Sequence, residues 1–253
     1  MNLIGLKTLL AKEVLRFMKV YLQTLVAPVV TSFLFLIIFS HVFGERMSVY
    51  DGVSYTAFLI PGLIMMSMIQ NAFANSSSSL IQSKVTGNLI FVLVTPLSNL
   101  EIFLAFVAAS AIRGILVGAV VYAVALAFLP VAPDHPFYVI VMSVLSCAML
   151  GALGLIAGMW AEKFDQMAGF TNFIIVPLSF LSGVFYSVHS LPDFWKAASH
   201  ANPFFYMVDG FRYGFYGVSD VSPWLSIVVT LVSLALVSAW TLYLLRRGYK
   251  LRD

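Results

Sequence analysis

Long apolar runs, separated by short polar segments, dominate the pattern of this chain. A helix needs about 20 mostly apolar residues to cross about 30 Å of hydrocarbon. We therefore predict membrane-spanning helices at about residues 22–43, 56–75, 100–129, 137–160, 168–186 and 223–245. The pattern predicts an all-α integral membrane protein with six transmembrane helices, forming a single domain over residues 1–253.

Composition excludes a soluble globular protein. Of the 253 residues, 61% are hydrophobic and 10% are charged, whereas a soluble domain carries about 25% charged residues. The mean hydropathy of +0.97 leaves too little polar surface to cover a water-exposed fold. The single cysteine, Cys147, cannot form a disulfide within the chain, and we interpret it as a small packing residue.

The positions of the basic residues predict the orientation in the membrane. With six spans, ten basic residues fall on one side: Lys7, Lys12, Arg16, Lys19, Lys84, Lys163, Arg246, Arg247, Lys250 and Arg252. Three fall on the other: Arg46, Lys196 and Arg212. Cytoplasmic loops carry the excess of Lys and Arg, so we expect both termini in the cytoplasm.

Two segments near the cytoplasmic side are too short or too polar to cross the membrane. Residues 1–20 place Leu6, Leu9, Leu10, Val14 and Phe17 on one helical face, and Lys7, Lys12, Glu13, Arg16 and Lys19 along its edge. This pattern predicts an amphipathic helix at the membrane interface or a charged topology anchor. In residues 80–99, the apolar core 89–94 predicts a short interfacial helix ended by Pro96, or a structural reversal between spans.

A polar, aromatic segment, residues 187–222, separates the last two predicted spans. Its centre reads "HANPFFYMVDGFRYGFYG", residues 200–217. Irregular backbone at membrane depth is tolerated only where protein or a cavity covers it. We expect two short helices that dip back into the outer leaflet, or an aromatic loop folded on the outer surface. On a helix, Asp209 and Arg212 would face each other and neutralise their charges.

Polar residues inside the predicted spans are candidates for a translocation path. Gln70, Asn71 and Asn75 are costly to expose to lipid, so they line a path or form interhelical hydrogen bonds. Matching candidates in the fifth span are Asn172, Pro177 and Ser179. Arg113 falls within the third span and is expected to point inward. The pairs Gly114/Gly118 and Gly154/Gly158 are expected to permit close helix packing within the subunit.

The chain carries no catalytic or nucleotide-binding motif. It has no phosphate loop of the form G-x-x-x-x-G-K-[ST], and no Ser-His-Asp set. His41, His135, His189 and His200 lack metal-ligand spacing. We therefore expect no catalytic residues, no metal site and no cofactor in this chain, and no nucleic-acid partner.

Three stretches resemble the ABC type-2 permease family. "KEVLRFMKVYLQTLVAPV" is similar to its interface helix, and "SKVTGNLIFVLVTPLSNLEI" to its coupling segment. "FLSGVFYSVHSLPDFWKAASHANPFFYMVDGFRYGFYG" resembles its most recognisable signature. The resemblance implies a permease in the bacterial inner membrane that pairs with a second copy and with two separate ATPase subunits, which would bind ATP and Mg²⁺.

The same resemblance implies roles for particular residues. The ATPase-coupling candidates are Lys84, Gly87, Asn88, Phe91, Thr95, Pro96 and Glu101. The outer-gate candidates are Gly183, Pro192, Asn202, Pro203, Asp209 and Arg212. Similar family members carry an acidic pair where this chain has Ile90 and Phe91, so the ATPase contact would be mostly apolar, or would shift to Glu101, Lys84 or the N-terminal helix.

The resemblance implies an exporter whose cargo is hydrophobic or amphiphilic: a drug-like molecule, a lipid or a lipid-linked glycan. The alternative is a self-powered secondary transporter of a small hydrophobic solute. That class usually needs intramembrane acids to bind coupling ions, and no acid falls clearly inside a predicted span. A membrane enzyme is disfavoured because no catalytic cluster is present.

Overall fold

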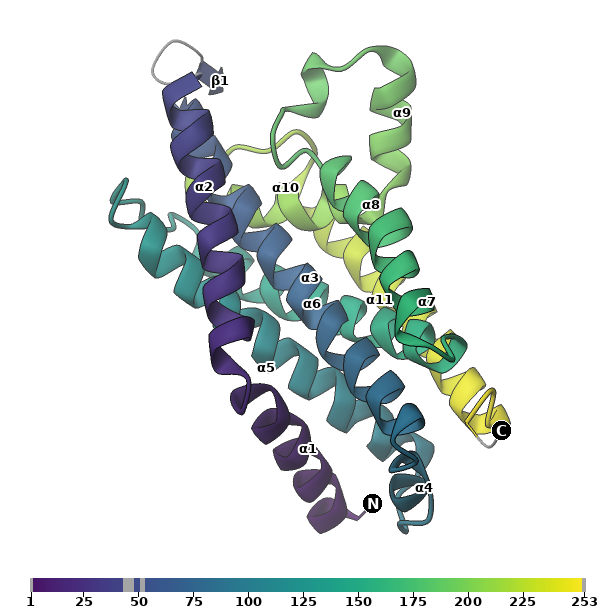
Figure 1. The fold of residues 1–253 in the computed structure, drawn as a ribbon. Coiled ribbons are helices and arrows are strands. Elements are labelled where there is room, and N and C mark those ends of the chain that lie inside the picture. The colour runs from purple at the N-terminus through teal and green to yellow at the C-terminus, as the bar shows by residue number, and fades with distance from the viewer. Residues whose placement is uncertain (1, 43–47, 51–52, 252–253) are drawn as a thin grey trace.

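The computed structural model describes residues 2–42, 48–50 and 53–251, and most of them are helical (Figure 1). Phe43, Arg46 and Arg252 lie outside the described residues. The first half contains α1 (Leu3–Met18), η1 (Leu22–Val26), α2 (Ala27–Val42), β1 (Ser48–Tyr50), β2 (Val53–Ser54), α3 (Tyr55–Val85), α4 (Leu89–Leu93) and α5 (Asn99–Ala125). The second half contains α6 (Pro136–Trp160), α7 (Phe164–Phe170), η3 (Thr171–Ile175), α8 (Val176–Phe180), η4 (Val188–Ser190), α9 (Asp193–Ala201), α10 (Pro203–Tyr216) and α11 (Pro223–Arg247).

Among the described residues, five helices are long and apolar enough to cross a membrane. They are Leu22–Val42, Tyr55–Val85, Asn99–Ala125, Pro136–Trp160 and Pro223–Arg247. Four agree closely with the predicted spans. The predicted end of the second span, at residue 75, is wrong, because α3 continues to Val85. Its serines bond within α3 and to other helices: Ser77 Oγ donates to Phe73 O at 2.8 Å, and Ser76 Oγ donates to Gly151 O of α6 at 2.6 Å.

The helix at the predicted fifth span, 168–186, both begins and ends earlier in the sequence than predicted. Its helical run covers residues 164–180 and consists of α7, the π-helical turn η3 and α8. The chain turns after Phe180, and Gly183 adopts a positive φ of 74° that favours glycine. The predicted boundary at residue 186 is therefore wrong, since this turn ends the helix first.

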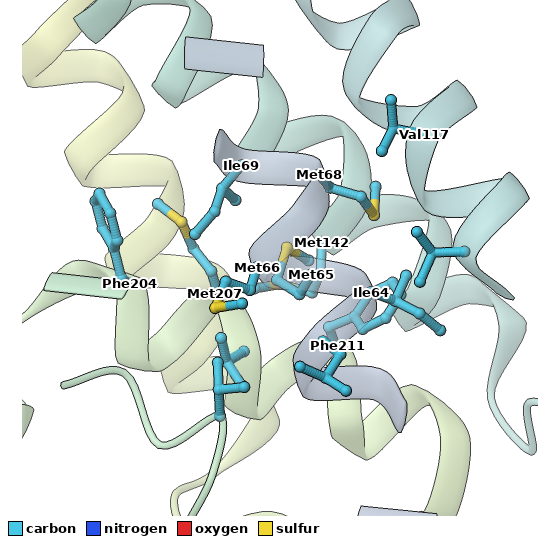
Figure 2. Packing of buried hydrophobic residues seen from close by; sticks show 14 of the residues in the cluster. Ile64, Met65, Met66, Met68, Ile69, Val117, Met142, Phe204, Met207 and Phe211 are labelled. Atoms are coloured by element: carbon cyan, nitrogen blue, oxygen red, sulfur yellow. The ribbon is translucent and has the colours of Figure 1, made fainter. Parts of the chain in front are cut away.

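Helix α3 forms the centre of the bundle. In its most apolar 18-residue window 83% of the residues are buried, against 11% for Leu22–Val42. Its methionines and isoleucines pack against α5, α6 and α10, and Figure 2 shows Met65, Met68, Met142 and Met207 in this cluster. Met side chains adapt to irregular gaps, which suits a core in which several helices meet.

Glycines set the closest helix contacts, as the sequence predicted. A Cβ at Gly154 would lie 2.5 Å from the Phe73 carbonyl oxygen of α3. A Cβ at Gly114 would lie 2.9 Å from the Met68 carbonyl oxygen. Real side chains avoid both distances, so these two glycines allow α5 and α6 to pack directly on the backbone of α3.

The two ends of the bundle differ in what they carry. α1, α4 and both chain termini lie at one end, which we call the inner end (Figure 1). β1, α9 and the loop before α9 lie at the opposite, outer end, with α10 crossing beneath them. The segment between the last two predicted spans forms two short helices, α9 and α10. That they dip back into the outer leaflet stays a prediction.

Candidate functional site

An exposed apolar surface occupies the inner end, on α4. Ile90, Phe91 and Val94 are 63%, 73% and 78% exposed. Beside them, a cleft of about 510 Å³ separates α4 from α1 and is lined by residues that include Lys12 and Pro96. We call α4, the facing side of α1 and this cleft the docking surface.

The seven predicted coupling residues divide into two groups. Gly87, Asn88, Phe91, Thr95 and Pro96 are exposed on or beside the docking surface. Lys84 instead donates to the carbonyl oxygens of Met159 and Ala161, at 2.9 and 2.7 Å, and so secures the end of α6. Glu101 is 3% exposed and accepts from Ser98 in a capping box. Lys84 and Glu101 therefore hold the inner end together internally.

A buried charge network joins α1 to α3. Glu13 is fully buried and accepts from Arg16 Nε at 3.1 Å and from Ser79 Oγ at 2.6 Å. Arg16 Nη2 donates to the backbone and side-chain oxygens of Asn75, at 2.7 and 2.9 Å. Asn75 in turn donates to Ser110 Oγ of α5 at 3.3 Å. We call these residues the inner network.

The burial of Glu13 corrects the predicted charged edge of α1. The buried side of α1 is the stripe of Leu9, Glu13 and Phe17, which recur every four residues. The spacing of Glu13 between two buried apolar residues was the available signal. A fully buried carboxylate is tolerated here because Arg16, Lys12 and Ser79 all donate to it.

A polar pocket of about 550 Å³ opens between α1, η1, α2, α3, α5 and η3. Two of the predicted path residues, Gln70 and Asn71, line it, together with Arg113 and Arg16. Arg113 Nη2 donates to Asn71 Oδ1 at 3.2 Å, which identifies a partner for this arginine. The structure thus brings together polar groups from three helices that are separated in sequence.

The other path candidates lie elsewhere in this conformation. Asn75 is fully buried within the inner network, which matches the interhelical alternative. Ser179 is also fully buried and donates to Ile175 O at 2.7 Å. Asn172 in η3 and Pro177 in α8 are exposed. Asn172 directly follows Thr171, which lines the polar pocket.

The outer end is closed by α10, whose charged side chains are buried. Arg212 is 1% exposed, donates to Gly183 O at 2.8 Å, and lies 3.8 Å from the ring centroid of Phe58. Asp209 is fully buried and accepts from the backbone amides of Asp220 and Val221, at 2.7 and 3.2 Å. The expected Asp209–Arg212 ion pair is absent from the described structure, because each group finds a closer partner.

Asp220, which the sequence analysis did not select, ties three segments together. Its carboxylate accepts from Tyr50 Oη at 2.5 Å, Ser187 Oγ at 2.8 Å and the Val188 amide at 2.7 Å. Burial raises the pKa of Tyr50 above its usual range, so its phenol remains a neutral donor. No local motif marks Asp220, because its partners are distant in sequence.

Two further side chains of this region donate hydrogen bonds to backbone carbonyl oxygens that have no partner within their own helix. Pro61 inside α3 cannot donate to Ala57 O, and Tyr216 Oη donates to that oxygen at 2.8 Å. Asn202 caps the start of α10 and also donates to Leu178 O at 2.7 Å. We call Asn202, Asp209, Arg212, Tyr216 and Asp220 the outer cap.

The three other predicted gate residues shape the backbone of this region. Gly183 supplies both the positive-φ turn and the carbonyl that Arg212 binds. Pro192 precedes α9 as its N-cap, and Pro203 begins α10. In the described part of the chain, no group of three or more His, Cys, Asp or Glu residues could hold a metal ion.

Comparison with known proteins places this architecture in a family. Residues 5–216 match the ABC-2 type transporter family model. The chain is 40% identical to the inner membrane transport permease YadH of Escherichia coli K12, over 99% of this chain and 98% of that protein. It is 27% identical to the capsule polysaccharide export inner-membrane protein CtrC of Neisseria meningitidis, over 87% and 83% of the two chains. It is 25% identical to nodulation protein J of Sinorhizobium fredii, over 67% and 65%. The chain therefore belongs to the ABC-2 type transporter family.

Proposed function

We propose that this chain is the permease subunit of an ATP-driven exporter in the bacterial inner membrane. Two copies would pair and would bind two separate ATPase chains, which hold ATP and Mg²⁺. The cargo would be a hydrophobic or amphiphilic molecule. Related permeases named for inner-membrane transport and for capsule polysaccharide export support this location and direction.

The exposed apolar docking surface is the observation that carries the proposal. Phe91 and Val94 are more than 70% exposed at the end that holds both termini. Large apolar side chains grouped at one end favour a protein partner over water. The basic residues at this end favour a cytoplasmic position, where an ATPase would reach the surface.

The inner network offers a mechanical route from the docking surface to the pocket. Helix α1 forms one wall of the docking cleft through Lys12, while Arg16 lines the polar pocket. Glu13 and Arg16 bind α3 directly. A movement of α1 on ATPase closure would therefore move groups at the pocket, and the ATPase can shift the permease only as far as it binds one state better.

The run α7–η3–α8 would make the sixth crossing. Although shorter than the other five, it is apolar, and Phe173, Ile174 and Phe180 are exposed on its surface. Together with α2, whose Val30 and Leu34 are also exposed, it provides a surface for lipid or for a second copy of the chain. The outer cap would close the far side of the path.

The proposal is tested by reconstituting the permease with candidate phosphate-loop ATPases from its own organism. We expect the permease to stimulate ATP hydrolysis, and Phe91→Asp to abolish most of that stimulation, because a carboxylate would enter an apolar interface. Phe194→Asp is the matched control, since Phe194 is 74% exposed on α9, at the opposite end of the molecule (Figure 1). Cargo transport that persists without any ATPase would instead favour the secondary transporter.

A further inference from the structure

Arg113 is a cation that the permease function alone leaves unexplained. Its Nη2 donates to Asn71, but its Nε is buried and has no hydrogen-bond partner. Among the ion pairs of the described residues, none within 4.0 Å involves Arg113. A cation inside a membrane protein is unfavourable without a counter-charge, so its presence at a pocket wall points to a missing anionic partner.

A second guanidinium reinforces the positive charge of the same pocket. Arg16 lines the pocket with Arg113, and its only carboxylate partner in the described structure is Glu13. That carboxylate also accepts from Lys12 at 2.9 Å. The charges around the pocket therefore do not balance within the chain: one buried carboxylate is shared between Arg16 and Lys12, and Arg113 is left over.

The walls of the pocket combine hydrogen-bond donors with apolar surface. Gln23, Gln70 and Asn71 contribute amides, while its lining contains no Asp or Glu. Val20, Pro28 and Met66 provide apolar walls. The volume of about 550 Å³ falls within the range of about 300–1,000 Å³ that is typical of small-molecule sites. These features suit a small oxyanion attached to a hydrocarbon chain.

We propose that this pocket binds the oxyanion head group, phosphate-like or carboxylate-like, of an amphiphile. Arg113 binds the anion directly, Arg16 adds its field, and Asn71 orients the Arg113 guanidinium. The hydrocarbon part lies along the exposed apolar face of α2, where Val30, Phe33 and Leu34 follow the pocket residue Pro28. The role of this amphiphile as cargo rests on the proposed function, whereas its binding is a property of the permease alone.

The test measures binding of dodecyl phosphate to the purified full-length permease in a neutral detergent, with no ATPase present. We expect saturable binding that dodecyl glucoside, of equal chain length and no charge, does not reproduce. Arg113→Gln should weaken binding at least about tenfold, because a charge-assisted hydrogen bond contributes that much affinity. Arg113→Lys should retain most of it.

Two further variants make the result specific. Arg246→Gln removes the same charge from an exposed position near the end of α11 and should leave binding unchanged. Asn71→Asp places a carboxylate where Arg113 already donates, so it should block the anion through an internal counter-charge. This variant keeps the proposal falsifiable if Arg113→Gln fails to fold.

The outcomes separate the ligand sources and the two proposals. Equal affinity in wild type, Arg113→Gln and Asn71→Asp, or equal binding of dodecyl glucoside, would overturn the oxyanion site. Competition of inorganic phosphate with dodecyl phosphate would support the site and identify a free anion as its ligand. Displacement of dodecyl phosphate in phosphatidylglycerol nanodiscs, but not in phosphatidylcholine nanodiscs, would support the site and identify a membrane lipid. Neither result alters the Phe91→Asp test, which measures ATPase coupling separately.

Discussion

The outer cap and the polar pocket each contain an arginine whose Nε is buried with no hydrogen-bond partner, but the two arginines differ in how far the protein encloses them. Arg212 is 1% exposed, donates to Gly183 O and lies over the ring of Phe58. Arg113 is only partly buried, faces a pocket, and donates to one amide oxygen. The chain itself surrounds Arg212 completely, whereas it leaves one side of Arg113 open.

This difference separates a structural charge from a binding charge. A buried charge with fixed partners strongly resists removal, because its partners would be left unsatisfied. A charge with few partners contributes little to stability and costs free energy to retain. Stability measurements on matched variants can therefore distinguish the two regions without knowledge of the cargo.

The largest expected loss of stability follows from Asp220→Ala. Tyr50, Ser187 and the Val188 amide would lose their shared acceptor, and each unsatisfied buried donor costs about 1–3 kcal/mol. We expect a loss of about 3 kcal/mol or more. Cys147 is buried and is the only cysteine, so its reaction with a thiol-reactive dye on heating reports unfolding.

Asp193→Ala provides the control for this measurement. Asp193 is exposed in the first turn of α9, near the same end of the molecule, and its removal should change the unfolding temperature little. If the two alanine variants unfolded at the same temperature, Asp220 would not hold the outer cap together.

Glu13→Gln is expected to give the next largest effect, at the inner network. The amide keeps the size of Glu13 but loses the charge that Arg16 and Lys12 bind. Hydrogen bonds to charged groups contribute about 1.5–3 kcal/mol, so we expect a loss of about 2 kcal/mol by the same dye assay. Lys12→Gln, at a side chain that is 47% exposed, should change stability by less than about 1 kcal/mol.

Local patterns allowed much of the fold to be predicted. The apolar runs identified the long helices, the short run 89–94 identified α4, and the paired glycines identified the close contacts with α3. Each of these features depends on residues within one segment. Helix length was missed for α3 because Ser76–Ser79 looked like an end, although interhelical contacts bury Ser76, Ser77 and Ser79.

The polar contacts were harder to predict because they join distant segments. Tyr50 and Asp220 are 170 positions apart, and Glu13 and Ser79 are 66 apart. Asp209 and Arg212 have the right spacing for an ion pair, yet backbone groups from other segments bind each of them instead. The sequence placed Gln70 and Asn71 among the path candidates, but only the packed helices place them beside Arg113.

Effects of opposite sign are expected when the two arginines are compared directly. Arg212→Gln should lower stability by about 2 kcal/mol, because the Gly183 carbonyl and the Phe58 ring lose a charged partner. Arg113→Gln should leave stability unchanged or raise it by up to about 1 kcal/mol, because it removes a cation with no carboxylate partner. The dye assay applies to both. An equal loss in the two variants would contradict the distinction between closed and open arginines.

The smallest expected effect lies at the exposed pair of Glu162 and Lys250, near the inner end. The hydrogen bond from Lys250 holds the pKa of Glu162 below its ordinary value of 4.5. Because the carboxyl is more acidic in the folded protein, the pair stabilises the fold at neutral pH, and this contribution is lost as the pH falls below 4.5. Water screens the pair, since Glu162 is 57% exposed.

Glu162→Gln should therefore lower the unfolding temperature only slightly at neutral pH, and the difference from wild type should vanish in acid. Tryptophan fluorescence during thermal unfolding can follow both proteins across this pH range, using the four native tryptophans. A loss at neutral pH as large as that of Asp220→Ala would mean that exposure does not separate weak from strong charge contacts in this protein. A small loss would agree with the weak contribution that is expected of an exposed charge pair.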